Sequence, residues 1–150
     1  MVKKQIFRKR YCIMKADDRI WRIIQKRLGY SDTEMQIFRE NPRNKDVISK
    51  AAVLMNKVIV LEVVESHGCN SRHRVGDKFY FDGAGNLLTD LSPKRICVFA
   101  LSNAAMMIFA VSEMIYAGVD PNTMRFKRTN CFDVGLQCGG WGAYCSSLQE

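Results

Sequence analysis

The sequence lacks the short motifs that identify several common classes of enzyme. It contains no phosphate-binding loop of the GxxxxGKS or GxxxxGKT type and no GxGxxG that opens a helix. It also contains neither the HExxH ligands of a metalloprotease nor a CxxC pair, and it shows no internal repeat. These absences argue against P-loop and dinucleotide-binding enzymes, HExxH metalloproteases and zinc ribbons.

A secretory signal is also missing, because no apolar segment follows the basic residues near the N-terminus. The chain has an even number of cysteines, which would suit disulfides in a secreted protein. Without a signal we expect a cytoplasmic protein whose cysteines are free thiols or metal ligands. The six cysteines are Cys12, Cys69, Cys97, Cys131, Cys138 and Cys145.

Positive charge is concentrated at the N-terminus. Residues 1–27 contain ten Lys or Arg against two Asp, which equals the net charge of +8 of the whole chain. A basic arm of this kind can contact nucleic acid or anionic lipid. The alternative is a solvated terminus followed by the polar side of a helix.

The first third of the chain has helical patterns. Apolar residues recur at helical spacing, Gly29 is suited to a helix end, and Ser31 with Glu34 has the spacing of a capping box. Pro42 is expected to end the second helix, since proline disfavours helix in the residue before it. We predict helices over residues 16–30, 31–41 and 45–57.

The rest of the chain predicts strands around one long helix. Ser92 and Gly118 are suited to the start and end of a helix over residues 93–117. We predict strands over residues 57–66, near 123–129 and near 141–147, and a hairpin over 77–89. The fold class is therefore α+β: a small, mostly antiparallel sheet packed on one long central helix, with a helical N-terminal segment. We place the boundary between residues 1–56 and 57–150.

The long helix could cross a bilayer by its length alone. Its apolar run is interrupted by polar residues, so we expect a core helix and no membrane contact. Those residues are Ser102, Asn103, Ser112 and Glu113.

Two cysteine-containing segments predict a chemical site. The stretch SHGCNSRHRVGD, residues 66–77, contains both histidines of the chain, and NCFDVGLQC follows sixty positions later. Thiolate and imidazole together suit zinc or iron, and a helix start favours a thiolate at its first residue. The predicted metal ligands are Cys69, His73, Cys97, Cys131 and Cys138. The alternative is that these cysteines only pack as small apolar residues.

Catalytic roles around such a site are assigned to three carboxylates. Asp77, Glu113 and Asp133 are candidates to transfer protons beside a metal-bound water. If Cys69 or Cys131 instead acts as a nucleophile with His73, the amides of Gly139 and Gly140 could bind an oxyanion or cofactor. Asp77 also has a structural interpretation, in which it binds backbone N–H groups in a turn.

A basic–aromatic stretch, MRFKRTN at residues 124–130, is a candidate surface for single-stranded nucleic acid. The alternative is an ordinary strand with Met124 and Phe126 facing inward and the charges facing solvent.

Residues 57–150 resemble a family of short, uncharacterised bacterial and archaeal proteins. Its members have a cysteine followed by GHKVGD, a C-P-x-A helix start and a late C-P-D. The matching stretches are CNSRHRVGD, ICVFAL and CFD, with Arg72 in place of the glycine before the histidine and with Val98 and Phe132 in place of prolines. The family has no settled activity, so the resemblance names no reaction. It implies that six residues are important: Cys69, His73, Asp77, Cys97, Cys131 and Asp133.

Taken together, the patterns favour a small protein with a cysteine and histidine site that binds zinc or iron or presents a reactive thiol. It would act as an enzyme or as the small subunit of one, in a homo-oligomer or with a larger partner subunit. The alternative is a non-catalytic module that binds protein or nucleic acid, the latter through its basic arm, with structural cysteines.

Overall fold

The computed structural model describes residues 18–141 and the backbone of residues 144–149. The described residues fall into two compact units, which divide between Ala52 and Val53. The sequence patterns placed the boundary four positions later, after residue 56. Most of the basic arm and Cys12 lie outside the described residues, as does the side chain of Cys145.

The first unit contains α1 (Asp18–Leu28), α2 (Asp32–Glu40) and most of α3 (Pro42–Met55). Ser31 and Glu34 form the predicted capping box at the start of α2. Trp21 and Met35 are buried, and the ring of Phe38 packs edge-on against Trp21. Pro42 begins α3, where its missing N–H costs no helical hydrogen bond.

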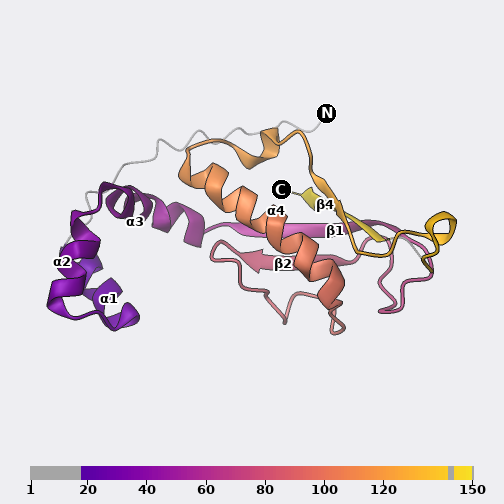
Figure 1. The fold of residues 1–150 in the computed structure, drawn as a ribbon, viewed down its shortest axis with the longest axis horizontal. Helices are drawn as coiled ribbons and strands as arrows, with labels where there is room; N and C mark the ends of the chain where they lie inside the picture. Colours follow the sequence, from indigo (N-terminus) through magenta and orange to yellow (C-terminus); the bar gives the residue numbers. More distant parts are fainter. Residues whose placement is uncertain (1–17, 142–143, 150) are drawn as a thin grey trace, which may run out of the picture. The chain divides into compact units, whose positions relative to one another are not determined.

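The second unit is an antiparallel sheet covered on one face by a long helix (Figure 1). Its strands are β1 (Val58–Ser66), β2 (Lys78–Asp82), β3 (Arg128–Asn130) and β4 (Tyr144–Gln149), in the order β2-β1-β4-β3. The helix is α4 (Val98–Tyr116). The predicted α+β class is confirmed.

The core lies between β1, β2 and α4. Alternate residues of β1 are buried, and Ile59 and Leu61 pair with Phe81 and Phe79 of β2. Val63 is fully buried. The helix contributes four buried residues of small to moderate size, which let it lie close to the sheet: Ala100, Ala104, Ile108 and Val111.

The long helix begins five residues later than predicted. Its N-cap is Cys97, whereas Ser92 accepts a hydrogen bond from the backbone N–H of Tyr80 in β2 at 3.0 Å. Ser92 therefore attaches the preceding loop to the sheet. The end is as predicted, because Gly118 follows the C-cap with φ of +73°.

The outer face of α4 is apolar and exposed within the second unit. Phe99, Met106 and Phe109 are each more than 60 % exposed. By length and composition α4 could cross a membrane, a test that core helices of soluble proteins also pass. The predicted absence of membrane contact stays a prediction.

Two predicted strands are shorter than expected. The chain after β2 turns at Asp82, and only an isolated bridge between Phe81 and Leu87 remains of the second hairpin strand. Residues Pro121–Thr123 form the 3-10 turn η1, so β3 begins at Arg128.

Candidate functional site

The loop between β1 and β2 carries the first cysteine of the site. Gly68 has φ of +60°, and a Cβ there would lie 3.3 Å from the carbonyl oxygen of Trp141. The loop therefore runs beside the backbone of the segment that precedes β4. A hydrogen bond of 2.8 Å from the N–H of Arg72 to the carbonyl of Cys69 closes a turn around Cys69.

The second cysteine, Cys97, is the N-cap of α4. Its carbonyl accepts the N–H of Leu101 at 3.0 Å, and its side chain makes no capping hydrogen bond. The first N–H groups of α4 thus have no intrahelical acceptor. Cys97 is partly buried and packs against the core.

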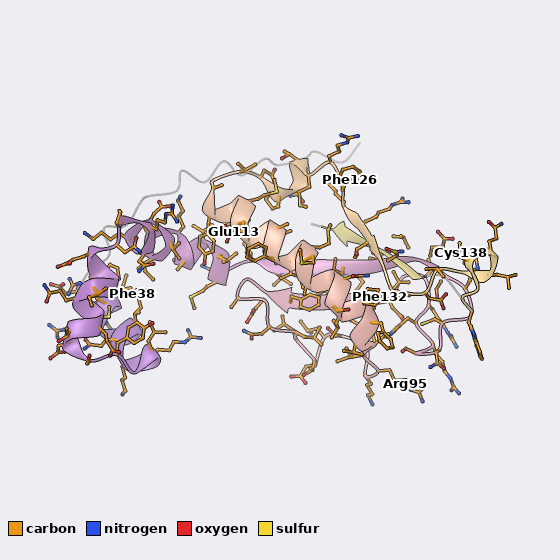
Figure 2. All side chains as sticks on the ribbon, in the orientation of Figure 1. Phe38, Arg95, Glu113, Phe126, Phe132 and Cys138 are labelled. Atoms are coloured by element: carbon orange, nitrogen blue, oxygen red, sulfur yellow. The ribbon has the colours of Figure 1, made fainter. Side chains whose placement is uncertain are left out.

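The third cysteine, Cys131, follows β3 directly. The side-chain amide of Asn103 donates to the carbonyl of Asn130 at 2.6 Å, which fixes this end of β3 to α4. The next residue, Phe132, packs edge-on against Phe99 with ring centroids 6.3 Å apart. Figure 2 shows Phe132 beside the first turns of α4. These contacts hold Cys131 close to the start of the helix.

These three segments line one pocket of about 390 Å³ that is open to solvent. Its walls are residues 67, 69–71, 96–99 and 131–133, so Cys69, Cys97 and Cys131 all line it. All three cysteines are free thiols of intermediate exposure. The structure thus places thiols that are 28 and 34 positions apart in the sequence along the wall of one pocket.

His73 does not line this cavity, although we predicted it as a ligand. It is only 4 % exposed, and its ring packs edge-on against Phe79 with centroids 5.0 Å apart. Its Nδ1 lies 3.6 Å from Oδ2 of Asp77. His73 is therefore part of the packing beneath the loop, and His67 is the described histidine that lines the cavity.

The structural interpretation of Asp77 is the one observed. Its Oδ2 accepts the backbone N–H of Arg74 at 2.9 Å, and its own carbonyl accepts the N–H of Val63 at 2.9 Å. Gly76 has φ of +94° in the same turn. Asp77 holds the loop onto β1, and it contacts His73 rather than the cysteines.

Glu113 lies away from the cysteines. It lines a second cavity, of about 720 Å³, near the C-terminal end of α4, and Figure 2 shows it well away from Phe132 along the helix. Burial, and then the charge of Glu113, raises the pKa of Tyr116 in this place. The predicted catalytic role of Glu113 beside the cysteines is not supported by this position.

Asp133 lines the cysteine cavity and also organises the following loop. Its Oδ1 accepts the N–H groups of Gly135 and Trp141 at 2.9 and 3.1 Å. A Cβ on Gly140 would lie 2.2 Å from this oxygen, so only glycine fits at position 140. The carboxylate thus holds residues 133–141 in a closed turn.

The amides of Gly139 and Gly140 do not form the predicted oxyanion hole. The N–H of Gly139 donates to Leu136 at 3.2 Å, and that of Gly140 donates to Gly135 at 2.8 Å. Both donors are therefore engaged within the turn. Cys138, in the short helix η2 (Leu136–Cys138), is exposed and lies in this turn rather than in the cavity wall (Figure 2).

A site for a single metal ion is not formed by the described residues. Among residues 18–141, no three His, Cys, Asp or Glu side chains are grouped so that they could hold one ion. The predicted set of five ligands is thus divided: Cys69, Cys97 and Cys131 share a cavity, whereas His73 and Cys138 lie elsewhere. The zinc or iron assignment stays a prediction.

The predicted ligand set omitted His67 and the aromatic wall of Phe99 and Phe132. His67 was visible as the residue two positions before Cys69, and its exposed imidazole lies 3.2 Å from a carboxylate oxygen of Glu65. The pairing of the two phenylalanines has no local signal, because it joins a helix start to a distant loop.

No model of a protein family, no curated protein and no solved structure matches the chain. The resemblance of residues 57–150 to the uncharacterised bacterial and archaeal family is therefore still a prediction.

Proposed function

We propose that the protein works through a thiol site in the cavity of Cys69, Cys97 and Cys131, as a small enzyme or as the small subunit of one. The observation that carries the proposal is that three free cysteines from three separate segments line the same cavity. Cys97 and Cys131 also pack against the core, so the proposal requires that their thiols are in addition accessible from the pocket.

The cavity has the size and composition of a site for a small ligand. Its volume of about 390 Å³ lies within the range of ligand pockets, and its walls combine apolar side chains with a few polar groups. Thiolates in such a place act as nucleophiles or as ligands of soft metals. A reducing cytoplasm, which the sequence predicts, would keep them available.

We assign His67 to accept the proton that a thiol gives up on binding or reacting. It is the described histidine in the cavity wall, and its other neighbour is the carboxylate of Glu65. Asp133 serves instead to hold the loop that carries Cys131. Asp77 and Glu113 have no part in this proposal.

Metal content and thiol reactivity of the anaerobically purified full chain test the proposal. We expect a stoichiometric metal ion, or rapid alkylation of a cavity thiol, that is lost in Cys69→Ser and Cys131→Ser. The matched control is Cys138→Ser, which removes an exposed thiol outside the cavity wall. A metal-free protein whose described cysteines all react at the rate of Cys138 would show that the proposal is wrong.

A second candidate function is binding of single-stranded nucleic acid, and one observation favours it. Phe126 is 70 % exposed, and the guanidinium of Arg125 lies 4.9 Å from its ring centroid. The alternative interpretation, in which Phe126 faces inward, is therefore wrong. The exposed ring could stack on a base. Binding of a labelled oligonucleotide that weakens with salt and with Phe126→Ala would support it, and equal binding by that variant would not.

A further inference from the structure

We propose that two copies of the chain associate through the outer faces of α4, with the two helices packed antiparallel. This inference is independent of the proposed thiol site. It rests on three properties of the exposed residues of α4: their position in a single stripe, the order of large and small side chains along that stripe, and the place of its charge.

The exposed residues of α4 form one stripe along the helix. The structure describes the whole of α4, and its exposed positions recur at helical spacing on the side opposite the residues that are buried against the sheet. At about 100° per residue they fall within an arc of about 120°. Besides Phe99, the stripe consists of Val98, Ser102, Ala105, Met106, Phe109 and Glu113.

The stripe has the same pattern of exposed positions in both directions along α4. Reversal about the midpoint between Ala105 and Met106 exchanges position 98 with 113, 102 with 109, and 105 with 106, and all six positions are exposed. A two-fold interface between identical copies requires such a pattern, because each position must meet its counterpart on the other copy. Phe99 lacks an exposed counterpart, and it packs against Phe132 at the edge of the stripe.

Side-chain sizes along the stripe are complementary in this arrangement. Phe109 of each copy lies opposite Ser102 of the other copy, and Met106 lies opposite Ala105. A large side chain thus meets a small one at each of the four central positions, so the two helices can approach to about 8–10 Å between their axes. Association then removes from water two large apolar side chains of each copy that are more than 60 % exposed.

The charge of the stripe selects the antiparallel direction. Glu113 is the charged residue of α4 and lies near its C-terminal end, whereas Lys94 and Arg95 are exposed just before its start (Figure 2). In the antiparallel pair Glu113 of one copy lies opposite Val98 of the other, close to these two cations and to the positive end of the helix dipole. In a parallel pair the two Glu113 carboxylates would lie together and repel each other.

The same stripe suits a second copy better than a membrane surface. Helices that lie in a bilayer interface carry Lys or Arg beside their apolar face, and α4 contains neither. To span a bilayer, α4 would have to leave the sheet against which four of its residues are buried: Ala100, Ala104, Ile108 and Val111. Lipid is therefore the alternative outcome of the test.

Sedimentation equilibrium of the full chain over a range of concentrations tests the inference. We expect a monomer–dimer equilibrium for the wild type. Phe109→Glu should raise the dissociation constant at least about thirtyfold, because the dimer would bury an unpaired charge. Met106→Glu should act in the same direction. The matched control is Leu136→Glu, which makes the same change at an exposed apolar residue outside α4 and should leave the dimer intact.

A charge exchange tests the antiparallel direction. Glu113→Lys places a third cation beside Lys94 and Arg95 of the other copy, so it should weaken the dimer several-fold. The addition of Lys94→Glu and Arg95→Glu in the same chain restores opposite signs and should return the dissociation constant toward that of the wild type, most clearly at low salt. A triple variant that associates no more tightly than Glu113→Lys would overturn the inference.

Folding of the variants is checked by circular dichroism and thermal unfolding. Stabilities of variants in the stripe are compared at concentrations below the dissociation constant, where association does not contribute. A wild type that stays monomeric at every concentration would overturn the inference, as would a dimer that Phe109→Glu leaves unchanged. Flotation of a monomeric wild type with phosphatidylcholine vesicles, lost in Phe109→Glu, would overturn it as well and assign the stripe to a membrane.

Discussion

At the scale of single residues, the loop that follows Cys131 depends on the fit between Asp133 and Gly140. The carboxylate of Asp133 accepts two backbone N–H groups, and the backbone of Gly140 occupies the space beside it. Because the neighbours of Gly140 are backbone atoms and a fixed carboxylate, they cannot move away from a larger side chain.

Replacing Gly140 should therefore disturb this loop. In Gly140→Ala the added Cβ meets Oδ1 of Asp133 and the N–H of Gly135, so we expect a loss of about 1–3 kcal/mol in the free energy of unfolding. Thermal or urea unfolding measures it. Gly139→Asn is the control, since position 139 is left-handed with open space around it, which asparagine tolerates. Equal stabilities of the two variants would contradict this packing around Gly140.

The hydrogen bonds of Asp82 predict that the free energy of unfolding depends on pH. Hydrogen bonds from the side chain and backbone N–H of Asn86 lower the pKa of Asp82 below its ordinary value. A lowered pKa in the folded state means that the carboxylate stabilises the protein above about pH 4. This contribution is lost as the pH falls through the lowered pKa.

Comparison of wild type with Asp82→Ala by urea unfolding at several pH values checks this. The difference in stability should be largest near neutral pH and should shrink below pH 4. A difference that stays constant down to the lowest pH would show that the charge of Asp82 does not contribute. Asp82→Asn, which keeps an acceptor for Ala84, should show a smaller loss.

Several roles of single residues were beyond prediction from sequence. The turn at Gly76 and Asp77 is one of the two interpretations that the sequence allows, because its signals are local. Which of the two histidines lines the pocket could not be predicted from the sequence, because that depends on which imidazole the core buries. His73 is buried against Phe79, a contact that appears only when β2 pairs with β1.

At the scale of elements, α4 is defined by the contrast between its two faces. The inner face has small residues against the sheet, and the outer face is apolar but exposed. The close approach of helix and sheet therefore depends on residues such as Ala104, which is 4 % exposed.

A larger residue at position 104 should separate α4 from the sheet. Ala104→Leu inserts three carbon atoms into a packed interface, so we expect a loss of about 1–3 kcal/mol in the free energy of unfolding. Ala105→Leu makes the same change at the adjacent, exposed position and should stay within about 0.5 kcal/mol of wild type. If both variants lose the same free energy of unfolding, the side chain of Ala104 does not pack against the sheet.

The capping box predicts the local stability of α2. Ser31 Oγ accepts the N–H of Glu34, so Ser31→Ala should lower the protection of α2 amides against hydrogen exchange by about fivefold, equivalent to about 1 kcal/mol. Thr33→Ala, within α2 and exposed, is the matched control. Unchanged exchange in Ser31→Ala would mean that the cap does not hold the helix.

Elements with local signals were the ones predicted well. The capping box and the ends of α1 and α4 follow from neighbouring residues. The start of α4 was missed because Ser92 is engaged by Tyr80, twelve positions away, and so does not cap the helix. Likewise β3 is short because Pro121–Thr123 forms a turn that the strand pattern did not reveal.

At the scale of the whole molecule, the fold explains how distant cysteines come to line one pocket. The loop after β1, the start of α4 and the end of β3 all surround one cavity of the second unit. The sequence allowed the cysteine segments to be singled out, but only the pairing of strands and the position of α4 decide which members meet. For this reason Cys97 lines the pocket, whereas Cys138 lies outside its wall.

Whether Cys69, Cys97 and Cys131 face one another in solution can be measured directly. A short bifunctional thiol cross-linker is applied to the reduced full chain, and peptide mapping then locates the linked residues. We expect cross-links among these three cysteines, and only single-ended labelling of the exposed Cys138. Labelling of all four without cross-links among the three would contradict the shared pocket, and with it the proposed thiol site.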